Sequence, residues 1–365
     1  MKQIFNLNDF SYTTHINLKY GDASFDYNST QNDLKKIDDY FFEKTKDLNF
    51  DYKVYHIYDK VLYENIKELL ETKKYRLITP HVINSYKMYT ENKHKIFVSN
   101  EKGQDYLIIQ NNCTFYLIEY PDPNNKTSYL MYLFRDIIRT HYENLGGFIF
   151  HSAAVVKNQR GIFMTGVGGA GKSTLTFNLI SLLDFKFVSN DRTFMTRDNK
   201  LTSFPMKIAI GKGTIGNNNL LYDCIKNNEK LISAYSKCFE FYDKVAFIPM
   251  ELSQSFDMSQ HSKENNFDII LFPYFNQNIN SIEQVHRKEA RKILIEACCS
   301  IKDPVWLKPI FKLHKKNKKE RCRNALNKID EILNTKPFYR LNYTKDLDAE
   351  KLYELLKKVG FYEKN

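Results

Sequence analysis

Gly166-Val167-Gly168-Gly169-Ala170-Gly171-Lys172-Ser173 is the stretch that decides the fold, because it is a complete G-x-x-x-x-G-K-[ST] phosphate loop. Its glycines let successive backbone N–H groups turn inward around the phosphates of a nucleotide without Cβ clashes. In such a loop the Lys172 ammonium reaches the β- and γ-phosphates, and the Ser173 hydroxyl is a ligand of Mg²⁺. The predicted phosphate-binding residues are Gly166, Gly168, Gly169, Ala170, Gly171, Lys172, Ser173 and Thr174.

The segments that flank the loop fit this interpretation. Residues 161–165 are a short apolar run that predicts a strand, and residues 173–183 predict a helix with Leu175 and Leu179 on one face. The N-terminus of that helix then directs its unpaired N–H groups and its dipole at the phosphates. A glycine-rich turn that binds nothing is the alternative.

The length of 365 residues allows two domains. We predict an N-terminal α+β domain over residues 1–145, which its position alone suggests as the acceptor-binding part, and a catalytic domain over residues 146–365. In the first, the predicted strands are 10–18, 52–58, 95–98, 105–109 and 114–119, and the predicted helices are 61–72 and 128–144.

Strands and helices also mix in the second half, without strict alternation. The predicted strands are 148–156, 161–165, 185–191, 244–249, 267–273 and 338–343, with a hairpin around Asp198-Asn199. The predicted helices are 173–183, 220–232, 283–299, 322–333 and 349–358. This order indicates an α/β fold with a mixed sheet rather than a purely parallel one.

Composition indicates a globular protein of the cytoplasm. Hydrophobic residues make up 42% of the chain, which is enough for a packed core, and no run reaches the roughly 18 apolar residues of a membrane span. The six cysteines show no C-x-x-C spacing and predict reduced thiols. The net charge of +11 and the basic stretch 308–323 would suit an acidic partner or nucleic acid. No RNA-binding signature accompanies them, so we expect a solvated linker and no nucleic-acid partner.

Asp191 is the second candidate site residue, because it closes the apolar stretch 185–191. A phosphate-loop enzyme needs a carboxylate near its metal ion, and the end of a neighbouring strand can supply it. We predict Asp191 as a metal ligand together with Ser173, and as the base that accepts the proton of an attacking hydroxyl. A capping aspartate at the strand end is the alternative.

His151 is the third candidate, because a short polar turn joins its strand to the phosphate-loop strand. An imidazole there can bond to the acidic residue or to a phosphate oxygen, whereas a buried structural histidine is the alternative. Arg192 follows Asp191 and would point to the opposite face of a continuous strand. Lys207, Lys212 and the stretch Gly211-Lys212-Gly213-Thr214 could bind phosphate or substrate, although isolated cations are more often solvated.

The order of three segments resembles the HPr kinase/phosphorylase family. These segments are His151-Ser152-Ala153-Ala154-Val155-Val156, the phosphate loop with Thr174, and Val188-Ser189-Asn190-Asp191-Arg192. The closer likeness is to the HPr-kinase-like serine kinases found near bacterial peptide-biosynthesis genes. It covers residues 147–345, including the late segment Pro337-Phe338-Tyr339-Arg340-Leu341.

The resemblance implies a P-loop kinase domain with the fold of phosphoenolpyruvate carboxykinase and HPr kinase. It also implies ATP and Mg²⁺ as cofactors, and transfer of the γ-phosphoryl group to a serine hydroxyl of a peptide or protein acceptor. Lys172 and Ser173 would hold phosphate and metal, Asp191 would be the catalytic base, and His151 would lie beside it. Relatives often form oligomers, which implies that a homo-oligomer can form.

Two departures from the family pattern keep other functions open. Asn190 replaces the first Asp of the acidic pair, which removes one negative charge from the metal site. The long glycine-containing signature of the reverse, phosphorolytic reaction is not recognisable, so we expect forward transfer to an acceptor other than HPr. The alternatives are a nucleotide-binding regulatory or scaffold protein with weak or no phosphotransfer, a small-molecule kinase, and a nucleic-acid-stimulated ATPase.

Overall fold

The structure is a computed structural model that describes residues 10–32, 34–47, 49–79, 85–91, 93–100, 105–121, 129–275, 278–302, 310–311 and 313–362. The chain divides into two compact units. The first comprises Met1–Asp38, Phe42–His141 and Lys308–Lys315, and the second comprises Asp39–Phe41, Tyr142–Leu307 and Lys316–Asn365. The division between His141 and Tyr142 lies inside helix α3 (Tyr129–Leu145), whereas the sequence-based boundary stood after its last residue.

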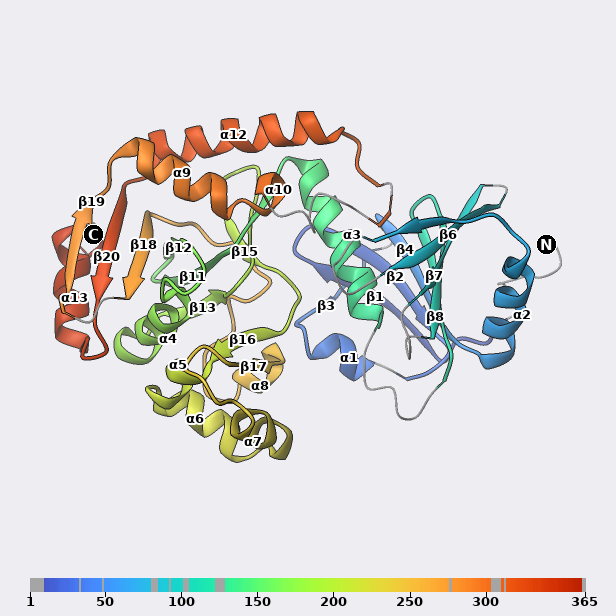
Figure 1. The fold of residues 1–365 in the computed structure, drawn as a ribbon, viewed down its shortest axis with the longest axis horizontal. Coiled ribbons are helices and arrows are strands. Elements are labelled where there is room, and N and C mark those ends of the chain that lie inside the picture. Colours follow the sequence, from blue (N-terminus) through green and yellow to red (C-terminus); the bar gives the residue numbers. More distant parts are fainter. Residues whose placement is uncertain are drawn as a thin grey trace. The chain divides into compact units, whose positions relative to one another are not determined.

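In the first unit, nine strands among the described residues form one sheet in the order β3-β1-β2-β4-β9-β8-β7-β6-β5 (Figure 1). They are β1 (Thr14–Tyr20), β2 (Ala23–Ser29), β3 (Glu43–Lys44), β4 (Tyr52–Tyr58), β5 (Arg76–Ile78), β6 (Tyr86–Glu91), β7 (His94–Ser99), β8 (Tyr106–Asn111) and β9 (Thr114–Glu119). The pairs β2–β4 and β4–β9 are parallel, and the others are antiparallel. Helices α1 (Leu34–Asp38) and α2 (Lys60–Glu71) accompany the sheet.

Aromatic residues build much of the core of the first unit. The Phe134 ring on α3 meets the Phe25 ring at 4.9 Å and the Phe42 ring at 5.0 Å between centroids, and all three side chains are buried. Edge-on and tilted contacts of this kind add to the free energy gained by burying large rings. The high Phe and Tyr content of the chain thus has a structural use here.

In the second unit, the main sheet has the order β13-β11-β12-β18-β20-β19 within the described residues. Its strands are β11 (Ser152–Lys157), β12 (Arg160–Thr165), β13 (Lys186–Ser189), β18 (Ile269–Phe275), β19 (Ser281–Gln284) and β20 (Phe338–Tyr343). The pairs β12–β18 and β18–β20 are parallel, and the remaining pairs are antiparallel. The predicted mixed sheet of an α/β fold is therefore confirmed.

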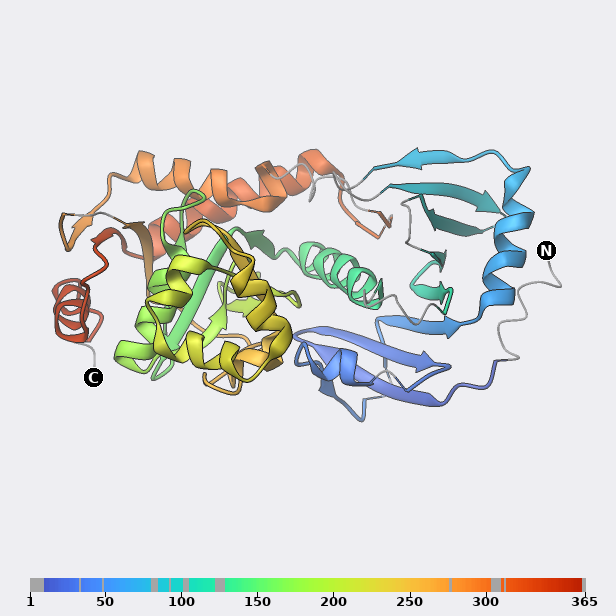
Figure 2. The same ribbon diagram turned by 60° about the horizontal axis from the view of Figure 1, so that its bottom comes forward.

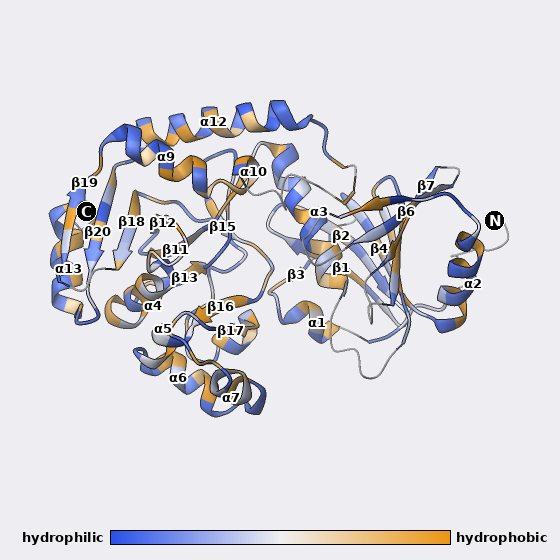
Figure 3. Cartoon of the chain, in the orientation of Figure 1, coloured by the Kyte–Doolittle hydropathy of each residue, from blue (hydrophilic) through white to orange (hydrophobic). Residues whose placement is uncertain are grey.

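Both faces of this sheet are buried, because successive residues of its strands point into different clusters. On β18, Ile269 and Leu271 join one cluster with α4 (Lys172–Leu183) and α13 (Ala349–Lys358). Ile270 and Phe272 join the other cluster with α9 (Arg287–Ala297) and α12 (Lys318–Thr335). Figure 2 shows α9 and α12 running together on one side, and Figure 3 shows hydrophobic and hydrophilic residues alternating along them.

Smaller elements complete the second unit. Strands β10 (Phe148–Phe150), β14 (Thr193–Met195) and β15 (Leu201–Ser203) form one small sheet, and β16 (Ile208–Gly211) pairs with β17 (Lys244–Phe247). Further helices among the described residues are α5 (Lys212–Gly216), α6 (Asn219–Lys226), α7 (Glu229–Ser236), α8 (Pro249–Leu252) and α10 (Cys299–Lys302). No helix in the described ranges is both long enough and apolar enough to cross a membrane.

Several predicted elements of the second unit are wrong in their extent. The predicted helix 220–232 is two helices, because the Asn228 side chain accepts a hydrogen bond from the Leu231 amide at 3.2 Å and starts α7 anew. The predicted helix 283–299 begins only at Arg287, because Ser281–Gln284 pairs with β20. The predicted strand 185–191 already ends at Ser189, and the predicted strand 148–156 is broken at His151.

Candidate functional site

The phosphate loop connects β12 to α4, as predicted, and opens into a cavity of about 590 Å³. Gly169 and Gly171 have φ angles of +80° and +93°, a region that favours glycine. A Cβ atom on Gly169 would meet no atom within 4 Å, whereas one on Gly171 would lie 2.1 Å from the Tyr343 hydroxyl. Gly171 therefore allows the close packing of Tyr343, whose hydroxyl donates to the Gly171 carbonyl oxygen at 2.5 Å.

The N-terminus of α4 has the character of an anion site. Gly171 is its N-cap, and no side chain of the described residues caps the helix. The first N–H groups of α4 and the positive end of its dipole are therefore available to a phosphate. Thr174, in the first turn, shares a hydrogen bond of 2.7 Å with the Thr214 hydroxyl and so connects α4 to α5.

Lys172 is buried, and its ammonium group donates to the carbonyl oxygens of Gly166 and Val167 at 2.9 and 3.0 Å. Burial lowers the pKa of Lys172 to about 8, and the positive charges of Lys244 and Arg192 act in the same direction, against the opposing effect of Asp191. A negatively charged phosphate beside this ammonium would relieve the cost of burying it. Lys172 thus has the environment expected of a phosphate-binding residue.

Strand pairing brings His151 and Asp191 together. His151 lies between β10 and β11, and the residues 190–192 lie between β13 and β14. Because β10 pairs with β14 and β11 pairs with β13, the break at His151 faces the turn that contains Asp191. The His151 Nε2 atom lies 3.2 Å from the Asp191 Oδ1 atom, and both residues line the cavity. The predicted neighbourhood of the two residues is present in the structure.

Asp191 stands in an unusual backbone conformation with φ of +72°. The turn around it is closed by a hydrogen bond of 2.6 Å between the hydroxyls of Ser189 and Thr193. Arg192 does not point away as expected from strand alternation, because the strand has already ended. Its guanidinium lies 3.2 Å from the Asp191 carboxylate. Strained residues of this kind persist where the surroundings hold them and often lie at functional sites.

The Asp191 carboxylate is held in its charged form. Burial alone would raise the pKa of Asp191, but the hydrogen bond from His151 and the charge of Arg192 outweigh it and lower the pKa to about 2. The group is thus a carboxylate at neutral pH, available as a cation ligand and as a hydrogen-bond acceptor for a hydroxyl.

Asn190 lies next to Asp191 in the same cavity and is only 4% exposed. Neither its Oδ1 nor its Nδ2 atom has a hydrogen-bond partner among the described residues. A buried amide without a partner costs about 1–3 kcal/mol, so such groups need an explanation. A ligand bound in the cavity would supply the missing partner.

Other residues of the cavity escaped the sequence analysis. Lys244, at the start of β17, is a second cation there, and Phe241, Tyr242 and Phe275 also line it. Gly211 and Thr214, which belong to a stretch that the sequence marked as a candidate for phosphate binding, line it as well. A lysine that begins an apolar strand was visible in the sequence, but nothing showed that the pairing of Gly211 with Lys244 brings it to the phosphate loop.

The other basic candidates lie elsewhere. The Lys212 ammonium donates to the Cys238 carbonyl oxygen, and Lys207 does not line the cavity. In the stretch 308–323, residues 308, 309 and 312 lie outside the described residues, and Phe311 is fully buried. Arg321 is also buried and lies 3.8 Å from Glu143. The expectation of a solvated linker is therefore wrong for these two side chains.

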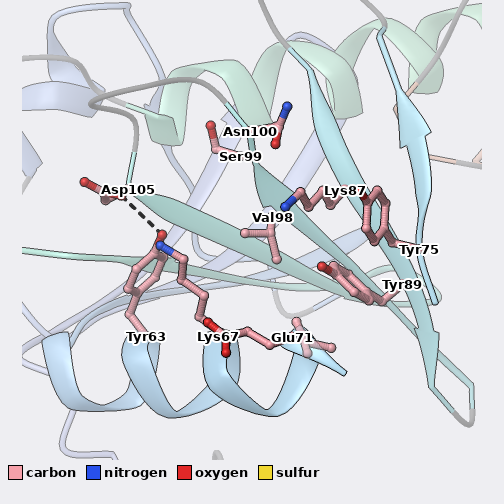
Figure 4. A pocket seen from close by; sticks show the side chains of 11 residues that line it. Tyr63, Lys67, Glu71, Tyr75, Lys87, Tyr89, Val98, Ser99, Asn100 and Asp105 are labelled. Atoms are coloured by element: carbon pink, nitrogen blue, oxygen red, sulfur yellow. Dashed lines mark hydrogen bonds between the residues drawn. The ribbon is translucent and has the colours of Figure 1, made fainter. Parts of the chain in front are cut away.

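The first unit has a cavity of its own, of about 540 Å³, between α2 and strands β6 and β7 (Figure 4). Its two lysines lie over tyrosine rings, Lys67 at 5.5 Å from the Tyr63 ring centroid and Lys87 at 5.1 Å from the Tyr75 ring centroid. The Tyr63 hydroxyl donates to Asp105 at 3.4 Å. Both lysines, Tyr63 and Asp105 are thus in contact with other residues of the same cavity.

Two comparisons with known proteins found no relative: no protein-family model matches the sequence, and no curated protein gives a significant match. In the described residues, no group of three or more His, Cys, Asp or Glu side chains could hold a metal ion by itself. The geometry of the cavity in the second unit is therefore the basis on which a function is proposed.

Proposed function

We propose that the protein is an ATP-dependent kinase that transfers the γ-phosphoryl group to a hydroxyl. The proposed acceptor is the hydroxyl of a serine in a peptide or protein. One observation carries the proposal: an anion-binding helix N-terminus, a buried lysine and an ionised aspartate held by a histidine meet in one cavity. Phosphoryl transfer needs this combination, because its catalysis is mainly positioning and charge neutralisation.

The proposed roles follow from the positions of the side chains. The backbone N–H groups of the phosphate loop and the ammonium groups of Lys172 and Lys244 bind the phosphate oxygens. Asp191 orients the acceptor hydroxyl, whose oxygen bonds to the γ-phosphorus while the bond from that phosphorus to the β–γ bridging oxygen breaks. The hydroxyl proton passes to the Asp191 carboxylate, and ADP leaves. With a pKa of about 2, Asp191 is a weak base and receives the proton late.

The residues of the cavity fit Mg²⁺. This ion prefers oxygen ligands, keeps several waters, and is usually held by one or two carboxylates together with substrate phosphates. The Ser173 hydroxyl, the Asp191 carboxylate and the unpartnered Asn190 amide offer such oxygens, without a complete cage. When bound, the ion would neutralise charge on the β- and γ-phosphates. Asn190 orients a neighbouring water or phosphate oxygen through its amide.

We also assign the second unit to the fold type of phosphoenolpyruvate carboxykinase and HPr kinase. The support is the phosphate loop between β12 and α4 of a mixed sheet, together with the sequence resemblance described above. Serine as the acceptor rests on the resemblance alone.

Label transfer from γ-labelled ATP tests the function. The full-length protein is incubated with Mg²⁺, labelled ATP and a library of serine-containing peptides, and ATP binding is measured in parallel by calorimetry. We expect magnesium-dependent binding and label on peptide. Binding without any label on peptide or protein would contradict kinase activity, and no binding would contradict the whole assignment.

Asn190 favours one second candidate, a nucleotide-binding regulatory protein with little turnover, because it leaves the site with one carboxylate fewer than the acidic pair of the resembling family. The variant Asn190→Asp separates the two functions. A regulatory protein should gain transfer activity with the added carboxylate. A kinase adapted to Asn190 should lose activity, since a second negative charge beside Asp191 repels the phosphates and raises the pKa of the acidic pair.

A further inference from the structure

The loop of residues 239–242, here called the aromatic loop, exposes three large aromatic side chains. Phe239 is 89% exposed, Phe241 49% and Tyr242 71%. Grouped apolar side chains at a surface mark interaction sites more often than isolated ones do. Because Phe241 and Tyr242 also line the cavity of the phosphate loop, this surface continues into the candidate active site.

The aromatic loop is held by the chain around it. The Asp243 carboxylate accepts hydrogen bonds from the amides of Phe239 and Glu240 at 2.8 and 3.1 Å. The carbonyl oxygen of Phe241 accepts from the Gly213 amide at 3.1 Å. Backbone hydrogen bonds to Glu240 and Phe239 lower the pKa of Asp243, so this carboxylate stays charged at neutral pH. The rings are therefore presented by an ordered turn.

Close packing at Gly213 supports the same conclusion. A Cβ atom at Gly213 would lie 1.7 Å from a carbon of the Phe241 ring. This ring thus rests directly on the backbone of α5. Pre-ordered side chains lose less conformational entropy when a partner binds them.

We propose that the aromatic loop docks the acceptor and selects an apolar or aromatic residue next to the serine that receives the phosphoryl group. The proposal rests on the kinase function proposed above. A segment whose hydroxyl reaches Asp191 enters the cavity that Phe241 and Tyr242 line, so its neighbouring residues lie against these rings. A nucleotide base would cover only rings inside the cavity, whereas Phe239 extends the apolar surface beyond the cavity lining.

Peptide binding tests the proposal independently of phosphoryl transfer. The full-length protein, saturated with Mg²⁺ and a non-hydrolysable ATP analogue, is applied to an array of peptides with a central serine. The serine is flanked by Phe and Leu in one set and by Asp and Gly in the other. We expect about tenfold tighter binding of the apolar set, as follows from burying one or two large side chains.

The double variant Phe239→Ala/Tyr242→Ala should lose this preference about tenfold. The single variant Phe239→Ala, whose ring does not line the cavity, should lose part of it with unchanged affinity for the ATP analogue. Tyr222→Ala is the control, because Tyr222 is another exposed ring, on α6, that does not line the cavity. Equal binding of both peptide sets, or a preference that survives the double variant, overturns the proposal. So does weaker nucleotide binding by the single variant, which would assign the rings to the base. A smaller assembly size of the double variant than of the unchanged protein in solution also overturns it, because it would assign the rings to a contact with a second copy. If the unchanged protein prefers the apolar peptides and the double variant does not, but no phosphate is transferred, the docking role stands and only the kinase function is contradicted.

Discussion

The two units each hold a cavity of similar size with lysines and aromatic rings, about 540 Å³ in the first and about 590 Å³ in the second. They differ in how their polar groups are satisfied. In the first cavity Lys67 and Lys87 lie over tyrosine rings and Asp105 accepts from Tyr63. In the second, Asn190 has no partner among the described residues, and Asp191 has a strained backbone.

Cavity size and composition alone therefore do not identify a functional site. The second cavity has features that cost stability: a buried ammonium with a lowered pKa, an unpartnered amide and a positive φ at a non-glycine residue. Such costs persist where a ligand or a reaction compensates for them. Residues of the same type in the first cavity therefore serve as controls for substitutions in the second.

The largest effect is expected for Lys172→Met. The variant removes the only charge that the phosphate loop itself contributes, so label transfer from ATP should fall by about 10²–10³. Lys67→Met is the matched control and should leave transfer within twofold. If Lys67→Met abolished transfer as well, the contrast between the cavities would be wrong, and the first unit would take part in the reaction.

A large but more selective effect is expected for Asp191→Asn. The amide keeps the shape of the side chain but accepts no proton, so transfer should fall by roughly 10², the lower end of general-base effects, while nucleotide binding persists. Asp105→Asn in the first cavity is the control. Full activity of Asp191→Asn in the label-transfer assay would remove Asp191 from its role as base.

The local sequence determined some elements closely and others not at all. Strand Tyr52–Tyr58 and helix Ala349–Lys358 have the predicted bounds, because alternation marks the strand and Asp348 caps the helix by accepting from the Lys351 amide at 2.8 Å. The extent of β19 depends on pairing with β20, far away in the chain, and no local pattern reports this.

The candidate site shows the same limit. The phosphate loop carries its own signature, and the predicted phosphate-binding residues other than Gly166 line the cavity. His151 and Asp191 were singled out from the strands predicted beside the loop. Lys244 could not be, because only the long-range pairing of β16 with β17 brings it to the cavity. The same pairing, with the turn around Asp243, places the aromatic rings.

A moderate effect is expected at His151, which acts by positioning Asp191. His151→Ala removes the hydrogen bond that lowers the pKa of Asp191, so transfer should fall about ten- to a hundredfold. The direction of the change in the pH profile follows from the Asp191 carboxylate, which is charged above its pKa and becomes protonated as pH falls through that value. The acidic limb of the profile should therefore move to higher pH in the variant. His151→Gln, which can still donate a hydrogen bond, should restore part of the activity; an unmoved limb would argue against the role.

The smallest effect concerns the protonation of Lys172. Its pKa is about 8 in the folded protein against an ordinary value of 10.5. Between pH 8 and 10.5 the unfolded chain therefore binds more protons than the folded chain, so the free energy of unfolding increases as pH rises. A bound phosphate raises the pKa again. Nucleotide binding above pH 8 should thus take up a fraction of a proton and weaken as pH rises.

Calorimetry at pH 8.5, in buffers that differ in ionisation enthalpy, measures this uptake, where about half a proton or more per nucleotide is expected from the two pKa values. Lys172→Arg is the control, because its guanidinium stays charged throughout and should show no uptake from this position. An uptake that persists in Lys172→Arg would assign the proton to another group. Zero uptake in the unchanged protein would mean that the ammonium at Lys172 is not desolvated, and the second cavity would then lose one of the features that set it apart from the first.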